Sequence, residues 1–159
     1  MLRTLIRRTP IRQMARCFLS TDRYFDKVLI ANRGEIAERV IRTCRRLGIR
    51  TTAIFSTADS HSRFVEMADE AFCVGPPNDS YLNVPKILDV IKTTGAQAVH
   101  PGYGFLSENS RFCNEIQKAG AVFLGPPVSA IQKLGDKIES KKIATEADVT
   151  IIPGYDGVV

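Results

Sequence analysis

Short apolar runs alternate along the chain with longer amphipathic segments, and this alternation restricts the possible fold more than any other feature. The run KVLIA at 27–31 is rich in β-branched residues and nearly all apolar, which is typical of a strand buried on both faces of a sheet. The next segment, 34–47, has apolar residues on one helical face and Glu/Arg pairs four residues apart on the other. Strands separated by such helices form right-handed βαβ units. The sequence therefore predicts an α/β fold with a parallel sheet that is covered on both sides.

This pattern continues to residue 124 and then changes. Further strands are expected at 51–55, 70–74, 97–100 and 121–124, and further helices at 85–94 and 107–119. After Pro127 the chain shows two helical segments at 129–134 and 137–146, a strand-like stretch at 149–152 and a turn at 153–154. The last residues follow this turn without a capping element. We therefore expect one domain over 24–125 and the incomplete start of a second over 126–159.

The basic charge of the chain is concentrated at its N-terminus. The formal net charge is +5; the first 23 residues hold six arginines and one acidic residue, and the remainder carries equal numbers of basic and acidic residues. A globular part without excess positive charge excludes nucleic acid as a partner. Arginines interleaved with apolar and hydroxyl residues are typical of a mitochondrial presequence, expected here over 1–20 with cleavage near Phe18. A basic tail with no targeting function is the alternative.

The sequence offers no signal for a membrane span or a metal site. No uninterrupted hydrophobic run exceeds four residues, whereas a membrane-spanning helix needs about 20. The four cysteines, at positions 17, 44, 73 and 113, form no C-x-x-C pair and have no histidine at metal-ligand spacing. We therefore expect no membrane partner and no metal ligands, and we interpret Cys44, Cys73 and Cys113 as small core residues.

The first strand-to-helix turn lacks the residues of a dinucleotide site. A Rossmann-type site carries G-x-G-x-x-G at this position, but the turn here contains Gly34 alone. The second strand is followed by Ser56 and Thr57, so the carboxylate that usually binds the ribose is also missing. These two absences argue against an NAD- or FAD-dependent oxidoreductase. Gly34 is interpreted as a tight turn, and Arg33 as a structural or interface residue.

A second candidate feature is the segment HPGYGFLSEN at 100–109, between a buried strand and a helix. Open α/β sheets bind ligands at the carboxyl ends of their strands, which is where this loop falls. Its glycines permit a sharp turn, Ser107 is placed to cap the next helix, and Glu108 in the first turn would suit the helix dipole. A loop that only packs fits these features equally well. His100 is interpreted as a hydrogen-bonded structural residue.

A third candidate feature is Lys137. Asp136 followed by Glu139 predicts a capping box, which places Lys137 at the first helical position. A cation there opposes the helix dipole, but it can bind phosphate oxygens together with the free N–H groups of the helix start. An exposed lysine without a ligand is the alternative.

Three motifs, in the same order and at matching spacing, resemble the biotin carboxylase family. They are FDKVLIANRGEIA at 25–37, the decapeptide at 100–109 and LGDK at 134–137. Within the family, DKIESK at 136–141 and PGYDGVV at 153–159 are most similar to the mitochondrial propionyl-CoA carboxylase branch, with the methylcrotonyl-CoA and pyruvate carboxylases as alternatives. The resemblance implies a Rossmann-like pre-ATP-grasp domain followed by the truncated start of an ATP-grasp domain.

The resemblance also implies an activity and its cofactors. In the family, ATP phosphorylates bicarbonate, the ureido nitrogen of biotin is carboxylated, and Mg²⁺ holds the phosphates. By residue-to-residue match, Lys137 is expected to contact ATP phosphates, and Tyr103 and Glu108 to line the pocket. The resemblance assigns no catalytic residue and no metal ligand to this chain, because the family's remaining functional groups would lie beyond Val159.

We therefore expect the N-terminal portion of a mitochondrial matrix ligase subunit that acts in propionyl-CoA conversion to methylmalonyl-CoA and works with other carboxylase subunits. The 159-residue chain alone is expected to be inactive and to bind ATP, Mg²⁺ and biotin weakly. The alternative is a non-catalytic module that docks to full-length subunits.

Overall fold

A computed structural model describes residues 24–152 of the chain and shows a five-stranded parallel sheet. The strand order is β3-β2-β1-β4-β5. The strands are β1 (Lys27–Ile30), β2 (Arg50–Phe55), β3 (Glu70–Cys73), β4 (Ala98–His100) and β5 (Val122–Phe123). The expected α/β class and parallel sheet are confirmed.

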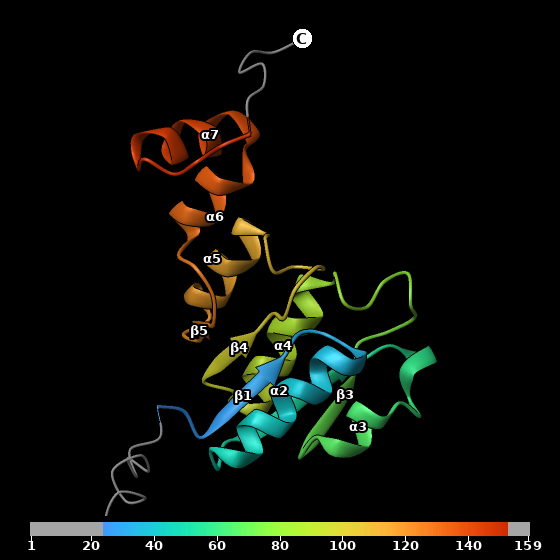
Figure 1. The fold of residues 1–159 in the computed structure, drawn as a ribbon. Coiled ribbons are helices and arrows are strands. Elements are labelled where there is room, and N and C mark those ends of the chain that lie inside the picture. The colour runs from blue at the N-terminus through green and yellow to red at the C-terminus, as the bar shows by residue number, and fades with distance from the viewer. Residues whose placement is uncertain (1–23, 153–159) are drawn as a thin grey trace, which may run out of the picture.

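Helices cover both faces of this sheet (Figure 1). The helices of residues 24–152 are α2 (Gly34–Arg46), α3 (Arg63–Met67), α4 (Val84–Thr94), α5 (Ser110–Lys118), α6 (Val128–Gly135) and α7 (Lys137–Glu146), and a 3₁₀ turn, η1, spans Thr57–Asp59. One face packs against α2 and α3, and the other against α4 and α5.

The alternation of side chains along β1 divides the core into two layers. Val28 and Ile30 point into the cluster formed with α2 and α3, whereas Leu29 points into the cluster formed with α4 and α5. All four residues of β1 are buried, because the strand lies in the middle of the sheet with a helix layer on each side. This arrangement explains why Val28, Leu29 and Ile30 are all apolar rather than alternating; the buried Lys27 at the start of the strand is paired with Glu70.

The strand order also determines where a ligand site would form. The chain runs outward from β1 through β2 to β3 and then crosses back to β4 on the other side of β1, so the order reverses between β1 and β4. In open α/β sheets, ligands bind outside the carboxyl ends of the strands at such a reversal. Here that position is occupied by the loop after β1, residues 31–33, and the loop after β4, residues 101–109.

The two last helices are attached to the domain unequally. Figure 1 shows α6 leading away from the sheet, with α7 at its far end. Ile131 of α6 is 8% exposed and belongs to the core that contains α4 and α5, whereas Leu134 one turn later is 60% exposed. Helix α7 contains no buried residue. Attachment to the core therefore decreases along α6 and is lost in α7.

Three expectations about local structure are wrong. Residues 149–152 form no strand, although Val149, Ile151 and Ile152 gave that stretch a strand-like composition. The helix expected from residue 107 begins at Ser110, because the Asn109 side chain, not Ser107, accepts a hydrogen bond from the Phe112 N–H at 2.8 Å. Glu108 therefore precedes this cap and is not in the first helical turn.

The cysteines follow the core interpretation only in part. Cys44 and Cys113 are buried as expected, whereas Cys73 is exposed at the end of the edge strand β3. Cys17 and the expected presequence lie outside the described residues. Between residues 24 and 152, no helix is long and apolar enough to cross a membrane.

Candidate functional site

Asn32 joins the two loops at the point where the strand order reverses. It lies two residues after the end of β1 and is completely buried. Its Nδ2 donates hydrogen bonds to the carbonyl oxygens of Pro101 at 2.8 Å and Tyr103 at 2.9 Å, and its Oδ1 accepts one from the Arg33 N–H at 2.9 Å. One side chain therefore satisfies backbone groups on both loops and fixes the first half of the 101–109 loop against β1.

Gly102 makes this close approach possible. Its φ is +66°, in the left-handed region that side chains rarely adopt. A Cβ at this position would lie 2.5 Å from the Asn32 Nδ2 and 2.9 Å from Ile36 Cγ2. Glycine is thus required at position 102 for two reasons: the backbone has a positive φ there, and a side chain would collide with Asn32.

His100 is engaged in the same loop, as expected for a structural residue. Its Nδ1 accepts a hydrogen bond from the Gly102 N–H at 3.0 Å. Burial, with a smaller contribution from the positive charge of Arg39, lowers the pKa of His100 below its ordinary value. A neutral imidazole is the form that accepts this hydrogen bond, so the low pKa and the contact agree.

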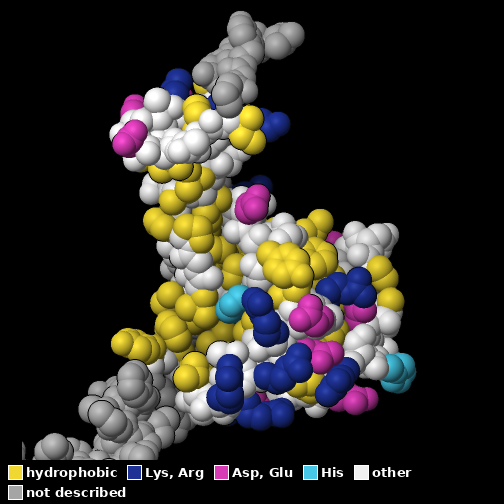
Figure 2. Space-filling view, viewed as in Figure 1, with side chains coloured by type: hydrophobic (Ala, Val, Ile, Leu, Met, Phe, Trp, Pro, Cys, Tyr) yellow, Lys and Arg dark blue, Asp and Glu magenta, His cyan; other side chains and the backbone are white. Residues whose placement is uncertain are grey.

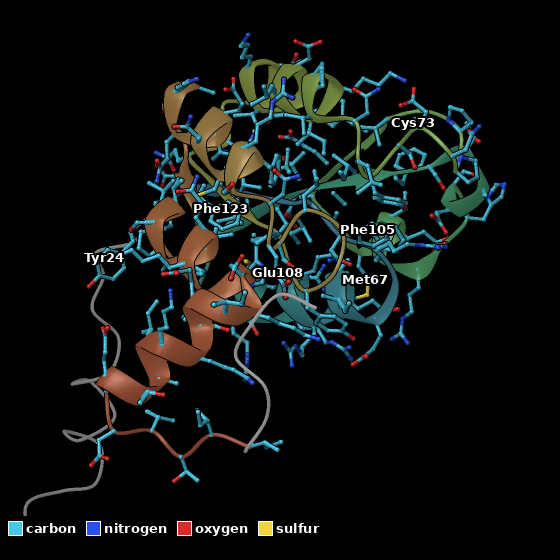
Figure 3. All side chains as sticks on the ribbon, turned by 90° about the horizontal axis from the view of Figure 1, so that it is seen from above. Tyr24, Met67, Cys73, Phe105, Glu108 and Phe123 are labelled. Atoms are coloured by element: carbon cyan, nitrogen blue, oxygen red, sulfur yellow. The ribbon has the colours of Figure 1, made fainter. Side chains whose placement is uncertain are left out.

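The loop presents the two pocket-lining candidates to solvent. Tyr103 is 64% exposed. Glu108, labelled in Figure 3, is also exposed. The turn between them is closed by a hydrogen bond from the Ser107 N–H to the Gly104 carbonyl at 2.9 Å. The structure therefore places Tyr103 and Glu108 on one exposed loop at the carboxyl edge of the sheet, available to a ligand.

Lys137 lies at the start of α7, outside the 101–109 loop that carries Tyr103 and Glu108. The Asp136 side chain caps this helix by accepting hydrogen bonds from the N–H groups of Ile138 at 2.8 Å and Glu139 at 2.9 Å. The Glu139 carboxylate pairs with Lys142 at 2.9 Å, within its own helix. Lys137 itself is exposed at the first helical position, as the sequence predicts.

A buried polar network lies beside the loop, and sequence reasoning did not find it. Asp59, 5% exposed, accepts hydrogen bonds at Oδ2 from the Tyr81 hydroxyl at 2.6 Å and the Ser56 hydroxyl at 2.8 Å. Its Oδ1 is paired with the Arg33 guanidinium, whose central carbon lies 5.7 Å from the centre of the Tyr81 ring. These residues come from the ends of β1 and β2 and from the segment between β3 and α4. Ser56 and Asp59 are three residues apart, but no spacing in the sequence links this pair to Arg33 or Tyr81.

The hydrogen bonds of this network determine its protonation state. Burial alone would raise the pKa of Asp59, but the hydrogen bonds from Tyr81, Ser56 and Arg33 outweigh burial and lower it below its ordinary value. Burial, reinforced by the contact with Asp59, raises the pKa of Tyr81 to about 12. At neutral pH the network therefore consists of an ionised carboxylate that accepts from a protonated phenol and a guanidinium.

The low pKa of Asp59 predicts a loss of stability in acid. A carboxylate whose pKa is lower in the folded state than in the unfolded state stabilises the fold above its unfolded value, about 3.9, and loses this contribution as the pH falls through the folded value. We expect Asp59→Asn to lower the free energy of unfolding by about 1–2 kcal/mol at pH 7, with a smaller difference from the parent below pH 4. Urea titrations at pH 7, 5, 4 and 3 measure this difference. A constant difference over that range would contradict the prediction.

Between residues 24 and 152 no three His, Cys, Asp or Glu side chains converge as a metal site would require. The described part of the chain therefore offers an exposed loop with Tyr103 and Glu108, an exposed lysine at a helix start and a buried network.

Comparison with known proteins finds one matching family model, and the similar proteins described below are biotin-dependent carboxylases or parts of them. The model of the family described as "Biotin carboxylase, N-terminal domain" matches residues 24–131. The chain is 63% identical over 135 residues to the mitochondrial propionyl-CoA carboxylase alpha chain of Caenorhabditis briggsae, and 59% identical over 140 residues to that of Homo sapiens. These alignments cover 84% and 87% of this chain but only 18% and 19% of the relatives. The chain thus spans about a fifth of the length of these curated relatives.

A solved structure agrees with this match. The chain superposes with a TM-score of 0.82 and 48% identity on the biotin carboxylase domain of the Hydrogenobacter thermophilus 2-oxoglutarate carboxylase, determined as a dimer in complex with MgADP, ADP and bicarbonate. The superposition covers 86% of this chain and 30% of that chain.

Proposed function

The chain belongs to the biotin carboxylase family, and we propose that it supplies the N-terminal part of a biotin-dependent carboxylase subunit of the propionyl-CoA type. The observation that carries the proposal is the 63% identity to a propionyl-CoA carboxylase alpha chain, which covers 84% of this chain. The family inferred from the three sequence motifs is confirmed, and so is the similarity to the propionyl-CoA branch.

The proposed activity is the ATP- and bicarbonate-dependent carboxylation of biotin, which feeds the conversion of propionyl-CoA to methylmalonyl-CoA. It is supported by the names of the relatives and by the MgADP and bicarbonate in the solved structure described above. Mg²⁺ would neutralise phosphate charge during this reaction. Its ligands, the biotin site and the groups that complete catalysis are proposed to lie in parts of the relatives that this chain does not match.

Within this chain, the proposal assigns roles to three residues. Lys137 would contact ATP phosphates, for which an exposed ammonium at a helix start is suited. Tyr103 and Glu108 would line the pocket from the loop at the carboxyl edge of the sheet. Their exposure and the position of that loop at the strand-order reversal support this role.

The domain organisation and the cellular location belong to the same proposal. Residues 24–125 would form the pre-ATP-grasp domain, and 126–159 the linker helices and start of the ATP-grasp domain. Residues 1–20 would be a presequence that directs the protein to the mitochondrial matrix, which agrees with the arginine-rich composition of the N-terminus and with the mitochondrial relatives. The partners would be other carboxylase subunits.

A chimeric enzyme tests the proposed function. The segment of the C. briggsae alpha chain that matches this chain is replaced by residues 24–152 of this chain, and bicarbonate-dependent ATP cleavage in the presence of biotin is measured. We expect an active chimera. Lys137→Gln should lower its kcat/KM for ATP about tenfold or more, because a charge-assisted contact to phosphate is lost.

Two controls accompany this experiment. Lys133→Gln removes an exposed lysine from α6 and should leave the kcat/KM for ATP unchanged, and the 159-residue chain alone should show no bicarbonate-stimulated ATP cleavage. A folded but inactive chimera would refute the proposed function. Equal losses for both lysine variants would refute the role of Lys137 alone.

A second candidate function is a docking module for full-length carboxylase subunits. It is favoured by exposed apolar residues that follow the folded domain: Leu134, Val149 and Ile152. Figure 2 shows hydrophobic side chains along α6 on the face drawn. Exposed apolar residues mark a contact with another protein segment where they form a contiguous patch. The amide exchange experiment in the Discussion separates the two candidates.

A further inference from the structure

Phe105 has an unusual backbone conformation in the middle of the candidate loop. Its φ is +44°, and within residues 24–152 the only other non-glycine residue at positive φ is Asp148. Aspartate tolerates this region through local hydrogen bonds, whereas a bulky aromatic residue does not. The hydrogen bond from the Ser107 N–H to the Gly104 carbonyl closes the turn that contains Phe105. This backbone contact does not place the Phe105 ring, whose position depends on side-chain packing.

The contact that stabilises Phe105 comes from Tyr81. The two ring centroids are 5.1 Å apart, with an angle of 39° between the ring planes. This separation lies within the range of favourable aromatic pairs. Phe105 is partly exposed, whereas Tyr81 is buried in the core beneath it. The ring of Tyr81 therefore forms part of the floor on which the loop rests.

Tyr81 is in turn fixed by the buried network. Its hydroxyl donates to the Asp59 carboxylate at 2.6 Å and accepts a hydrogen bond from the Ser56 N–H at 3.2 Å. The Arg33 guanidinium lies near the same ring. The phenol therefore has few alternative orientations, and the surface that it offers to Phe105 is rigid.

The two halves of the loop are held in different ways. Asn32 binds the carbonyl oxygens of Pro101 and Tyr103 in the first half. In the second half, the backbone hydrogen bonds of Ser107 and Asn109 go to Gly104 and Leu106, within the loop itself. The attachment of this half to the domain thus depends on the burial of Leu106, on the ring contact of Phe105 and, at its end, on the Asn109 cap of α5.

We propose that Tyr81 and Phe105 form an aromatic clamp that fixes the second half of the 101–109 loop, and that Tyr81 is thereby a positioning residue for Glu108. The clamp connects the loop to the Asp59 network at the end of β2, so the position of Glu108 depends on Tyr81 and on the carboxylate that binds its hydroxyl. The roles of Tyr103 and Glu108 rest on the proposed function, but the clamp itself does not.

Amide hydrogen exchange of the 159-residue chain, followed by NMR, tests the clamp. The reporters are the Ser107 and Asn109 amides in the loop, each referred to the Leu29 amide in β1. Relative to that core amide, Tyr81→Leu and Phe105→Leu should each accelerate loop exchange about two- to tenfold, because each removes the aromatic pair. Tyr81→Phe keeps the ring and should retain most of the loop protection. Tyr24→Leu, at an exposed tyrosine, is the matched control and should change neither reporter.

The double variant Tyr81→Leu/Phe105→Leu distinguishes a clamp from two independent effects. If the rings act as a pair, the double variant exchanges no faster than the faster single variant. Multiplicative acceleration, or equal acceleration of the loop and of Leu29, would overturn the proposal. If Tyr81→Leu does not fold, Phe105→Leu at the partly exposed partner still decides whether the ring contact protects the loop. These measurements need neither ATP nor biotin, so the clamp and the proposed function can fail separately.

Discussion

Replacing Asn32 with alanine is expected to lower the free energy of unfolding by about 3 kcal/mol. The Asn32 side chain donates to two backbone carbonyl groups, those of Pro101 and Tyr103, and it is completely buried. Its truncation leaves both carbonyls without this donor, at a cost of about 1–3 kcal/mol for each buried group that stays unsatisfied. Urea denaturation at pH 7 measures the change in the unfolding free energy.

Asn83→Ala provides the matched control for this prediction. Asn83 caps α4 by accepting a hydrogen bond from the Lys86 N–H at 3.0 Å. Loss of such a cap costs about 1 kcal/mol. If Asn32→Ala costs no more than Asn83→Ala, then Asn32 does not hold the two loops together in the manner described.

The layers of the fold could be predicted from the sequence because they depend on local patterns. The strand expected at 27–31 and the helix expected at 34–47 end within one residue of β1 and α2. A central parallel strand must be apolar on both faces, and an amphipathic helix must have its apolar residues on one side. These requirements leave a periodic signal in the sequence.

Elements without such a signal were missed or misassigned. Helix α3 spans five residues, Arg63–Met67, with only Phe64 buried, which is too short for a helical period to be recognised. The stretch 149–152 has a strand-like composition but no neighbouring strand to pair with in the described residues. A strand is stabilised by its partner, so composition alone could not decide this case.

The candidate site was only partly predictable, for a different reason. The resemblance to the family indicated Lys137, Tyr103 and Glu108, and Lys137 also lies at a recognisable helix start. The roles of these three residues stay predictions. The Asp59 network is built from irregular segments that are 22 to 26 residues apart in the chain. Only the folding of β1, β2 and β3 side by side brings Arg33, Asp59 and Tyr81 into contact. Arg33 was interpreted as a structural or interface residue, which is consistent with its pairing to Asp59.

Amide exchange in α7 is expected to be about 1,000-fold faster than in β1, relative to the intrinsic rates. Helix α7 has ten residues and none of them is buried, and an isolated helix of this length is marginal in water. The amides of β1 should exchange only when the whole domain unfolds, whereas those of α7 open locally. A ratio of 1,000 corresponds to about 4 kcal/mol in opening free energy. Hydrogen exchange followed by NMR or mass spectrometry measures it.

Helix α6 should show where protection ends. Ile131 is part of the core, so protection is expected to continue into the first turns of α6 and to decrease towards the exposed Leu134. Ile131→Ala should expose α6 to exchange, whereas Leu134→Ala, the matched control, should not. The same data decide whether the protected unit ends at residue 125, as the sequence predicts, or includes part of α6.

The protection of α7 also separates the two candidate functions. The rest of the ATP-grasp domain would lie in the part of the relatives that is not aligned with this chain. If α7 belongs to that domain, it has little to pack against here, and its amides exchange rapidly. Equal protection of β1 and α7 would contradict the prediction, because it would require α7 to be held on the domain or in a self-association. A self-sufficient unit of that kind would favour the docking module. Repeating the exchange at several protein concentrations would identify self-association, since only then does the protection of α7 rise with concentration.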